Sequence, residues 1–191
     1  MIEIRLRNRI VLIAVTLGVF VLDRWTKLLV EARLALGQSH EVLGKVLQFT
    51  HITNSNGVMG MSFGPFSRYL MLPLSLLAIT AIVYFYLRSQ TRSLLAALAT
   101  GFILGGAAGN MLDRFRTGAV TDFIDFDMPD ILIPPVRAGL LRFPGFYLDR
   151  WYTFNIADSA VLAWVALMIY ITIKEEYRTG TGPEAKNQKI Q

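Results

Sequence analysis

Four long apolar segments alternate with polar ones along the chain, and this pattern predicts four membrane-spanning helices. A helix needs about 20 predominantly apolar residues to cross the hydrocarbon core of a bilayer. The segments lie at about residues 10–30, 69–87, 94–112 and 154–173. A polar tail from 175 to 191 follows them and is predicted to be disordered. The sequence is therefore expected to form a single integral membrane domain over residues 1–191.

The first apolar segment also has features of a cleaved signal peptide. Arginines precede the uncharged run 10–22, as in the basic and apolar regions of such peptides. No small-x-small cleavage site follows the run, which passes directly into Asp23, Arg24 and Lys27. This favours a retained membrane span over a leader peptide.

Two polar connections carry signals of additional structure. Residues 46–53 (VLQFTHIT) are rich in β-branched and aromatic side chains and partly alternate, which predicts a short strand or hairpin. Residues 127–152 contain Pro134-Pro135, several aromatics and three arginines. We expect this longer connection to lie on the membrane surface as a loop or a helix.

Composition supports a membrane protein over a soluble one. The chain is 53% hydrophobic and only 17% charged, a balance that a soluble domain of this size would not keep in solution. The net charge of +5 could suggest nucleic acid, but the basic residues flank apolar segments and form no basic face, so no nucleic-acid partner is expected. They are denser in the N-terminal tail, the second connection and the C-terminus, which predicts N-in, C-in topology.

The predicted fold class is thus an all-α membrane protein with four transmembrane helices, a small extracytoplasmic β-hairpin or cradle, and the surface-lying segment 127–152. The third span places Gly101, Gly105 and Gly109 four residues apart, so that one helical face is bare backbone. A neighbouring helix can approach such a face closely, which predicts a central position for this span.

Several reactive groups are excluded by residue content. The chain has no cysteine, so it has no thiol nucleophile, disulfide or thiolate metal site. His40 and His51 are too few and too isolated to suggest a metal cluster. We expect no metal and no cofactor.

Ionisable and amide side chains gather at the predicted outer ends of three different spans. Charged groups near the hydrocarbon region are costly and mark functional sites by default. The N-in topology places them at one membrane level; they are Asp23, Lys27, Asn110, Asp113, Arg114, Asn155 and Asp158. Each group also has a purely structural interpretation.

The structural alternatives differ from motif to motif. Asp23 and Lys27 are one helical turn apart and could simply neutralise each other. Asn110, Asp113 and Arg114 could be the polar end of a helix. The stretch from Asp122 to Asp127 (DFIDFD) would by itself most often be an interfacial loop, in which acids alternate with apolar residues.

Taken together, the motifs resemble a known family. The strings GGAAGNMLDRFRTGAVTDFIDF (residues 105–126) and FNIADSA (residues 154–160) are similar to the two strongest signatures of lipoprotein signal peptidases. DRWTK (residues 23–27) resembles the first-span motif of that family, and Asn54 matches its outer-loop asparagine. Where the family usually has glycine two residues later, this chain has Asn56 followed by Gly57, so the alignment of Asn54 and Asn56 stays open.

The resemblance implies a catalytic pair and a set of supporting residues. Asp122 and Asp158 occupy the positions of the catalytic aspartates of the family. Asn110, Arg114 and Asn155 fall where the family contacts substrate or inhibitor, and Asp23 with Lys27 is expected to support the site. The connection 127–152 looks like an insertion relative to the family.

The same resemblance implies the substrate and the mechanism. Two adjacent carboxylates in a poorly solvated site share a proton, so one can act as base and the other as acid on water and the scissile carbonyl. The expected substrate is a diacylglyceryl-modified prolipoprotein, cut before its lipidated cysteine at the outer face of the bacterial inner membrane. Membrane lipid is an expected partner, and cyclic peptide antibiotics such as globomycin are expected inhibitors.

Two other classes of function are consistent with parts of the pattern. A small proton-coupled transporter would also place acids near lysine and arginine in its spans, but the second and third spans are apolar to their cytoplasmic ends. A membrane scaffold would use the glycine face for helix contacts, but it leaves the two aspartate motifs unexplained.

Overall fold

The computed structural model describes residues 2–55, 67–88, 93–127, 131–138, 141–143, 146–148 and 150–179. The chain divides into two compact units. The first comprises Met1–Arg24, Leu72–Leu112 and Ile156–Gln191, and the second comprises Trp25–Met71 and Asp113–Asn155.

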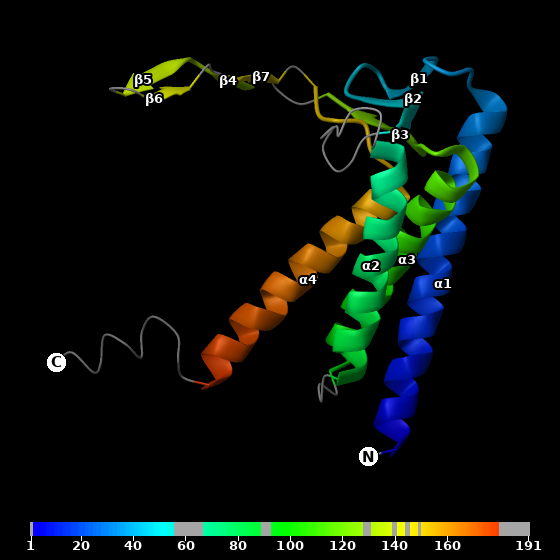
Figure 1. Ribbon diagram of the computed structural model, residues 1–191, viewed down its shortest axis with the longest axis vertical. Helices are drawn as coiled ribbons and strands as arrows, with labels where there is room; N and C mark the ends of the chain where they lie inside the picture. Colours follow the sequence, from blue (N-terminus) through cyan, green and yellow to red (C-terminus); the bar gives the residue numbers. More distant parts are fainter. Residues whose placement is uncertain are drawn as a thin grey trace. The chain divides into compact units, whose positions relative to one another are not determined.

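Long helices occupy all four of the predicted apolar segments. They are α1 (Ile2–Arg33), α2 (Ser67–Arg88), α3 (Leu94–Thr117) and α4 (Ile156–Thr179) (Figure 1). The α1 helix begins eight residues earlier than the predicted span, so the charged N-terminal residues before residue 10 are also helical. The α4 helix extends to Thr179, so residues 175–179 of the tail expected to be disordered are helical, and 180–191 lie outside the described residues.

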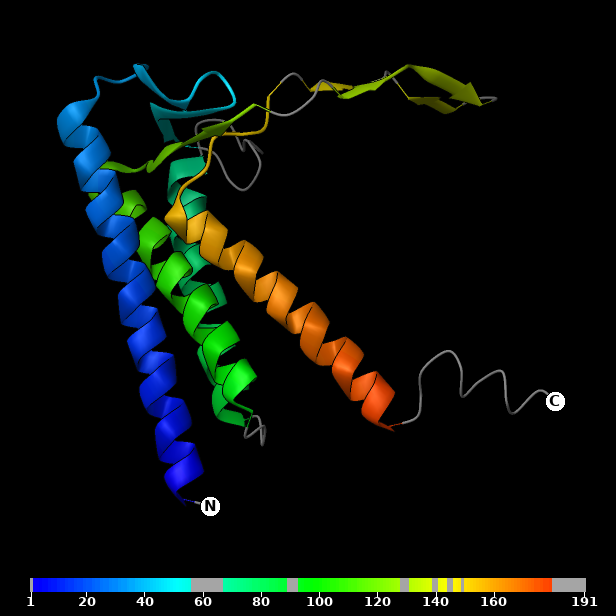
Figure 2. The same ribbon diagram turned by 180° about the vertical axis from the view of Figure 1, so that it is seen from behind.

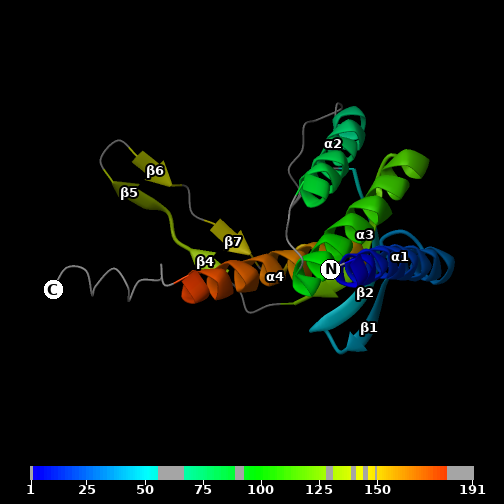
Figure 3. The same cartoon turned by 90° about the horizontal axis from the view of Figure 1, so that it is seen from below.

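Among the described residues, three helices are long and apolar enough to cross a membrane. These stretches are Leu70–Arg88, Leu94–Thr117 and Ile156–Tyr177. The α1 helix carries charged residues at both ends, and its role as a fourth span stays a prediction. Figures 1 and 3 show α3 between α1 and α2. The apolar stretch of α3 is 39% buried against 6% and 11% for α2 and α4, which confirms the predicted central position of α3.

Glycines allow α3 to approach its neighbours in the first unit. A Cβ added to Gly101 would lie 2.8 Å from the Val15 Cβ on α1, and one on Gly105 would lie 2.7 Å from the Thr16 carbonyl oxygen. The predicted glycine face therefore packs on α1. Gly106, which the spacing pattern did not single out, faces the start of α4: a Cβ there would lie 2.5 Å from the Ala157 carbonyl oxygen.

The second unit contains an antiparallel sheet of three strands. They are β1 (Ser39–Leu43), β2 (Leu47–Asn54) and β3 (Val120–Phe126), in the order β1-β2-β3. The β1–β2 hairpin confirms the strand predicted at 46–53. The interpretation of 122–127 as an interfacial loop was wrong for residues 122–126, which belong to β3. That strand is almost wholly buried, so its alternating acids did not indicate an exposed and a buried face.

The connection 127–152 is built from short strands in the part that the structure describes. β4 (Ile131–Ile133) pairs with β7 (Phe146–Leu148), and β5 (Val136–Ala138) pairs with β6 (Leu141–Phe143), both antiparallel. The two ladders follow one another along an extended ribbon (Figure 2). In its described part, the expected loop or helix therefore consists of two short strand pairs, and the class is mostly helical with small sheets, not all-α.

A glycine turns the chain from α3 into β3. Gly118 has a φ of 79°, in the left-handed region that costs a residue with a side chain. Its N–H donates to the Arg114 carbonyl oxygen at 3.0 Å, which satisfies one of the last carbonyls of the helix. β3 begins two residues later, at Val120. The turn at Gly118 therefore sets the direction of the strand that carries Asp122.

The packing at Gly106 gives the first testable prediction. Gly106→Ala places a methyl group against backbone that cannot rotate away, and we expect it to lower stability by about 2 kcal/mol. For a chain of this size that corresponds to a fall in Tm of about 4–8 °C. The measurement is thermal unfolding of the purified protein in detergent micelles.

Gly18 provides the matched control on α1. A Cβ there would have nothing within 4 Å, so Gly18→Ala should raise stability by about 0.5–1 kcal/mol through its helix preference. Equal Tm changes in the two variants would contradict the close approach of α3 to the first turn of α4.

Candidate active site

Asp122 is a buried carboxylate held by two asparagine amides in the second unit. Its side chain lies on β3 and is only 2% exposed. The Nδ2 group of Asn155 donates to its Oδ1 at 2.6 Å, and the Nδ2 group of Asn54 donates to its Oδ2 at 3.2 Å. Both carboxylate oxygens therefore accept hydrogen bonds, which a buried acid requires.

Local backbone pairing brings these two asparagines to Asp122. Asn54 is opposite Val120 in the ladder, and Asp122 lies two residues further along β3 on the same face. Phe154 exchanges backbone hydrogen bonds with Ile124 at 3.0 and 2.7 Å, which fixes the segment beside β3. Asn155 follows at once and is fully buried immediately before α4 begins.

Asp158 is an amide-bound carboxylate in the first unit. It is the third residue of α4, where the exposed N–H groups of the first turn favour negative charge. The Nδ2 group of Asn110 on α3 donates to its Oδ1 at 2.9 Å. The structure thus gives each predicted catalytic aspartate at least one asparagine donor.

Asp23 caps the helix that carries Asp158. Its side chain is fully buried, and its Oδ1 accepts the N–H of Ala157 at 2.9 Å. The absence of a side chain at Gly109 makes room for this carboxylate, because a Cβ there would overlap with it. Asp23 therefore fixes the first turn of α4, and its role in support of a catalytic site stays a prediction.

Lys27 forms a buried ion pair with Asp113. Its Nζ lies 2.8 Å from Asp113 Oδ2, and the two side chains are 0% and 3% exposed. The sequence suggested Asp23 as its partner, one turn away on the same helix, whereas this pair joins α1 to α3. Asp113 also accepts the N–H of Thr121 at 3.3 Å, a contact that no sequence signal indicated because it depends on tertiary placement.

Two predicted positions remain, Arg114 and the alternative asparagines Asn54 and Asn56. Arg114 is half-buried near the end of α3. Asn56 lies outside the described residues, so only Asn54 of the two alternatives is placed, and it contacts Asp122. Within the described part of the chain, no three His, Asp or Glu side chains are grouped to hold a metal ion.

The arrangement suits acid–base chemistry at carboxyl groups. Amide N–H groups can donate to a carboxylate or to the carbonyl oxygen of a protonated carboxyl, so they orient the acid without consuming its proton. Asp122 belongs to the second unit and Asp158 to the first. Asp122 is buried and Asp158 is half-buried.

Comparison with known proteins agrees with these motifs. A family model described as signal peptidase (SPase) II matches residues 15–174. A lipoprotein signal peptidase of Nostoc punctiforme is 32% identical over 180 residues, which cover 93% of this chain and 98% of that protein. One of Halothermothrix orenii is 30% identical over 162 residues, covering 85% and 94%.

Solved structures give the same result. A bacterial membrane enzyme, determined by the in meso method at 2.3 Å resolution, is similar with a TM-score of 0.68 at 26% identity. The likeness covers 86% of this chain and 88% of that one. The extent of the family match and the identity to whole relatives together show that this chain belongs to the signal peptidase II family.

Proposed function

We propose that this protein is an aspartic endopeptidase that removes the signal peptide from diacylglyceryl-modified prolipoproteins. Membership of the family makes it a peptidase that acts on lipoprotein signal peptides. The single observation that supports the aspartic mechanism is the binding of both motif carboxylates by asparagine amides.

We assign Asp122 and Asp158 as the catalytic pair. Asn155, whose amide donates to Asp122, is only three residues before Asp158 in the chain. In this proposal the two carboxyl groups lie side by side in a poorly solvated site and share one proton over a wide pH range.

The shared proton gives the pair its chemistry. The ionised member draws a proton from a water molecule, which attacks the scissile carbonyl carbon, while the protonated member donates to the carbonyl oxygen. The product of this step is a tetrahedral gem-diol, and no covalent enzyme adduct forms. Since the proton belongs to the pair, the two roles are a property of both aspartates together.

The membrane setting suits a lipidated substrate. The α2 and α4 helices leave most of their apolar side chains exposed, as expected for helices in contact with lipid. We propose α1 as the fourth span, with both termini cytoplasmic and the aspartates at the outer face of the bacterial inner membrane. The acyl chains of the substrate then stay in the bilayer while its peptide bond reaches the acids.

Asn54, Asn110, Arg114 and Asn155 complete the proposed site. Asparagine and arginine donors beside the acids can bind substrate carbonyls as well as orient the pair. We expect globomycin and related cyclic peptides to compete for these contacts. Asp23 and Lys27 support the site from α1.

The catalytic assignment is tested with Asp122→Asn and Asp158→Asn. Each change keeps the shape of the side chain but removes a group that can exchange a proton, so kcat should fall by about 10²–10⁴-fold or more. The measurement is cleavage of a lipidated prolipoprotein by the purified enzyme in lipid or detergent, with thermal unfolding as a check on the fold.

Asp127→Asn serves as the matched control. Asp127 lies one residue beyond β3, is 35% exposed and pairs with Arg150 at 3.5 Å, so its loss should leave kcat within about threefold. Near wild-type cleavage by either the Asp122 or the Asp158 variant would overturn the assignment.

The substrate class is tested by omitting the lipid. Each buried CH₂ of an acyl chain contributes about 0.8 kcal/mol to membrane partition, so an unlipidated precursor should lose at least about 10²-fold in kcat/KM. The two precursors should share one peptide sequence. Equal processing of both would show that the diacylglyceryl group is not recognised.

A further inference from the structure

The buried pair of Lys27 and Asp113 is not explained by stability alone. Its atoms are 2.8 Å apart and its side chains are 0% and 3% exposed. Removing two charges from water is so costly that a buried pair often contributes no more than an apolar pair of equal volume. The presence of this buried ion pair is therefore better explained by the geometry that it imposes on its neighbours.

One carboxylate oxygen joins this pair to the strand that carries Asp122. Asp113 Oδ2 contacts Lys27 Nζ and also accepts the backbone N–H of Thr121 at 3.3 Å. Thr121 directly precedes Asp122 in β3. A single oxygen atom thus connects α1, α3 and β3 beside the proposed catalytic acid.

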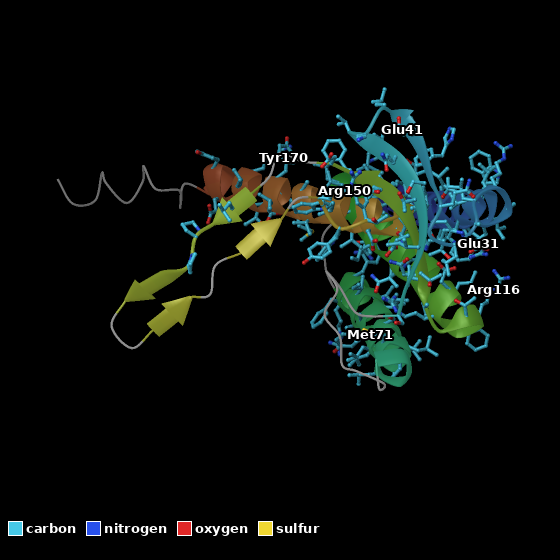
Figure 4. All side chains as sticks on the ribbon, turned by 90° about the horizontal axis from the view of Figure 1, so that it is seen from above. Glu31, Glu41, Met71, Arg116, Arg150 and Tyr170 are labelled. Atoms are coloured by element: carbon cyan, nitrogen blue, oxygen red, sulfur yellow. The ribbon has the colours of Figure 1, made fainter. Side chains whose placement is uncertain are left out.

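Thr121 is bound through all three of its polar groups. Besides its N–H, its Oγ1 donates to Glu31 Oε1 at 3.0 Å, and its carbonyl oxygen accepts from Asn155 Nδ2 at 3.3 Å. Figure 4 labels Glu31, which lies on α1. Asn155 also donates to the Asp122 carboxylate, so one amide group binds both the Thr121 carbonyl oxygen and the Asp122 side chain.

The sheet is irregular just beyond Asp122, on the side away from Thr121. Phe49 is opposite Ile124, but the next pair along is Ile52 with Asp122, so β2 has one extra residue here. Such a bulge disrupts the regular hydrogen bonds of the ladder, and bulges are frequent beside active sites. Thr121 is opposite Thr53 in the regular part of the ladder, and its contacts to Glu31, Asp113 and Asn155 add a constraint beside the irregular step.

We propose that the buried Lys27–Asp113 pair is a positioning device for the Asp122 carboxylate, and that it acts through the backbone N–H of Thr121. This inference rests on the proposed function, in which Asp122 is catalytic. Lys27 holds the Asp113 carboxylate as the acceptor for that N–H and is a positioning residue with no contact to substrate.

Two double variants separate positioning from general stability. The amide double variant, Lys27→Met with Asp113→Asn, removes both charges but keeps a carbonyl oxygen that can accept the Thr121 N–H. The apolar double variant, Lys27→Met with Asp113→Leu, removes both charges and that acceptor, with a side chain of similar size. The single variant Lys27→Met leaves a carboxylate without its cation, and the double variants remain informative if it fails to fold.

The two double variants should differ in kcat while their KM values stay alike. A misplacement of about 1 Å costs roughly 10²-fold in rate, so kcat of the apolar double variant should fall by about that factor. The amide double variant should stay within about fivefold of wild type, because its acceptor is retained. The measurement is cleavage of a lipidated precursor well below the Tm of each variant. Equal kcat values, or a rise in KM at unchanged kcat, would overturn the proposal.

Hydrogen exchange gives a readout that does not depend on catalysis. The Thr121 amide should exchange faster in the apolar double variant, whereas those of Phe123 and Ile124 should stay protected through their bonds to the Phe154 carbonyl oxygen. Unchanged protection of Thr121 would also refute the proposal. If wild type cleaves no lipidated precursor, the proposed function fails, and the exchange data still decide whether the pair holds Thr121.

Arg150→Met is the matched control for loss of an ion pair on the same strand. Arg150 Nε lies 3.0 Å from Asp125 Oδ1, on β3 like Asp122, but no hydrogen bond to Thr121 runs through this pair. We expect kcat and Thr121 exchange within about threefold of wild type. A loss equal to that of the apolar double variant would mean that any damage to β3 has the same effect, which contradicts a specific role for Lys27.

Discussion

The need to satisfy buried carboxylates governs the polar part of this structure. An acid removed from water loses many kcal/mol of solvation unless donors replace the water molecules. The chain meets this need with different donors at different acids: Asn54 and Asn155 bind Asp122, the Ala157 N–H binds Asp23, and Lys27 with the Thr121 N–H binds Asp113. The half-buried Asp158 accepts from Asn110. A neutral amide orients a carboxyl group without fixing its charge, so it is compatible with the sharing of a proton.

Two described cations form ion pairs with acids other than the proposed catalytic ones. Lys27 pairs with Asp113, and Arg150 pairs with Asp125 and Asp127. Neither pair joins a cation to Asp122 or Asp158. The charged pairs fix backbone segments, whereas amides bind Asp122 and Asp158.

Sequence reasoning succeeded where the chemistry of a residue is independent of its distant neighbours. Apolar run length located the four helices, and the four-residue spacing of Gly101, Gly105 and Gly109 indicated a close helix contact on α3. The motif residues Asn54, Asn110 and Asn155 were named from resemblance, and the structure brings each to an aspartate. Their catalytic and substrate-binding roles stay predictions that the experiments above test.

Sequence reasoning failed where the environment of a residue depends on which distant segment packs against it. The acids at 122–126 looked like a surface loop because alternation normally indicates one wet face, yet β3 is buried on both sides. The ion pair of Lys27 with Asp113 could not be predicted from local sequence, because the two residues lie on different helices. Thr121 and Gly106 lie within the motif string 105–126, but nothing in that string singled them out, because their importance comes from what lies opposite them.

The segment between the two aspartates shows how a fixed site can tolerate a long connection. The chain leaves the sheet at Asp127 and returns at Arg150, and these residues form an ion pair at 3.5 Å. The Trp151 N–H then donates to the Phe126 carbonyl oxygen at 3.1 Å, so both ends are fastened to the end of β3. Because the connection is closed at its base, its length and strand content can vary without moving Asp122 before it or Asn155 after it. Loop closure grows only slowly more costly with length, which makes such an insertion thermodynamically inexpensive.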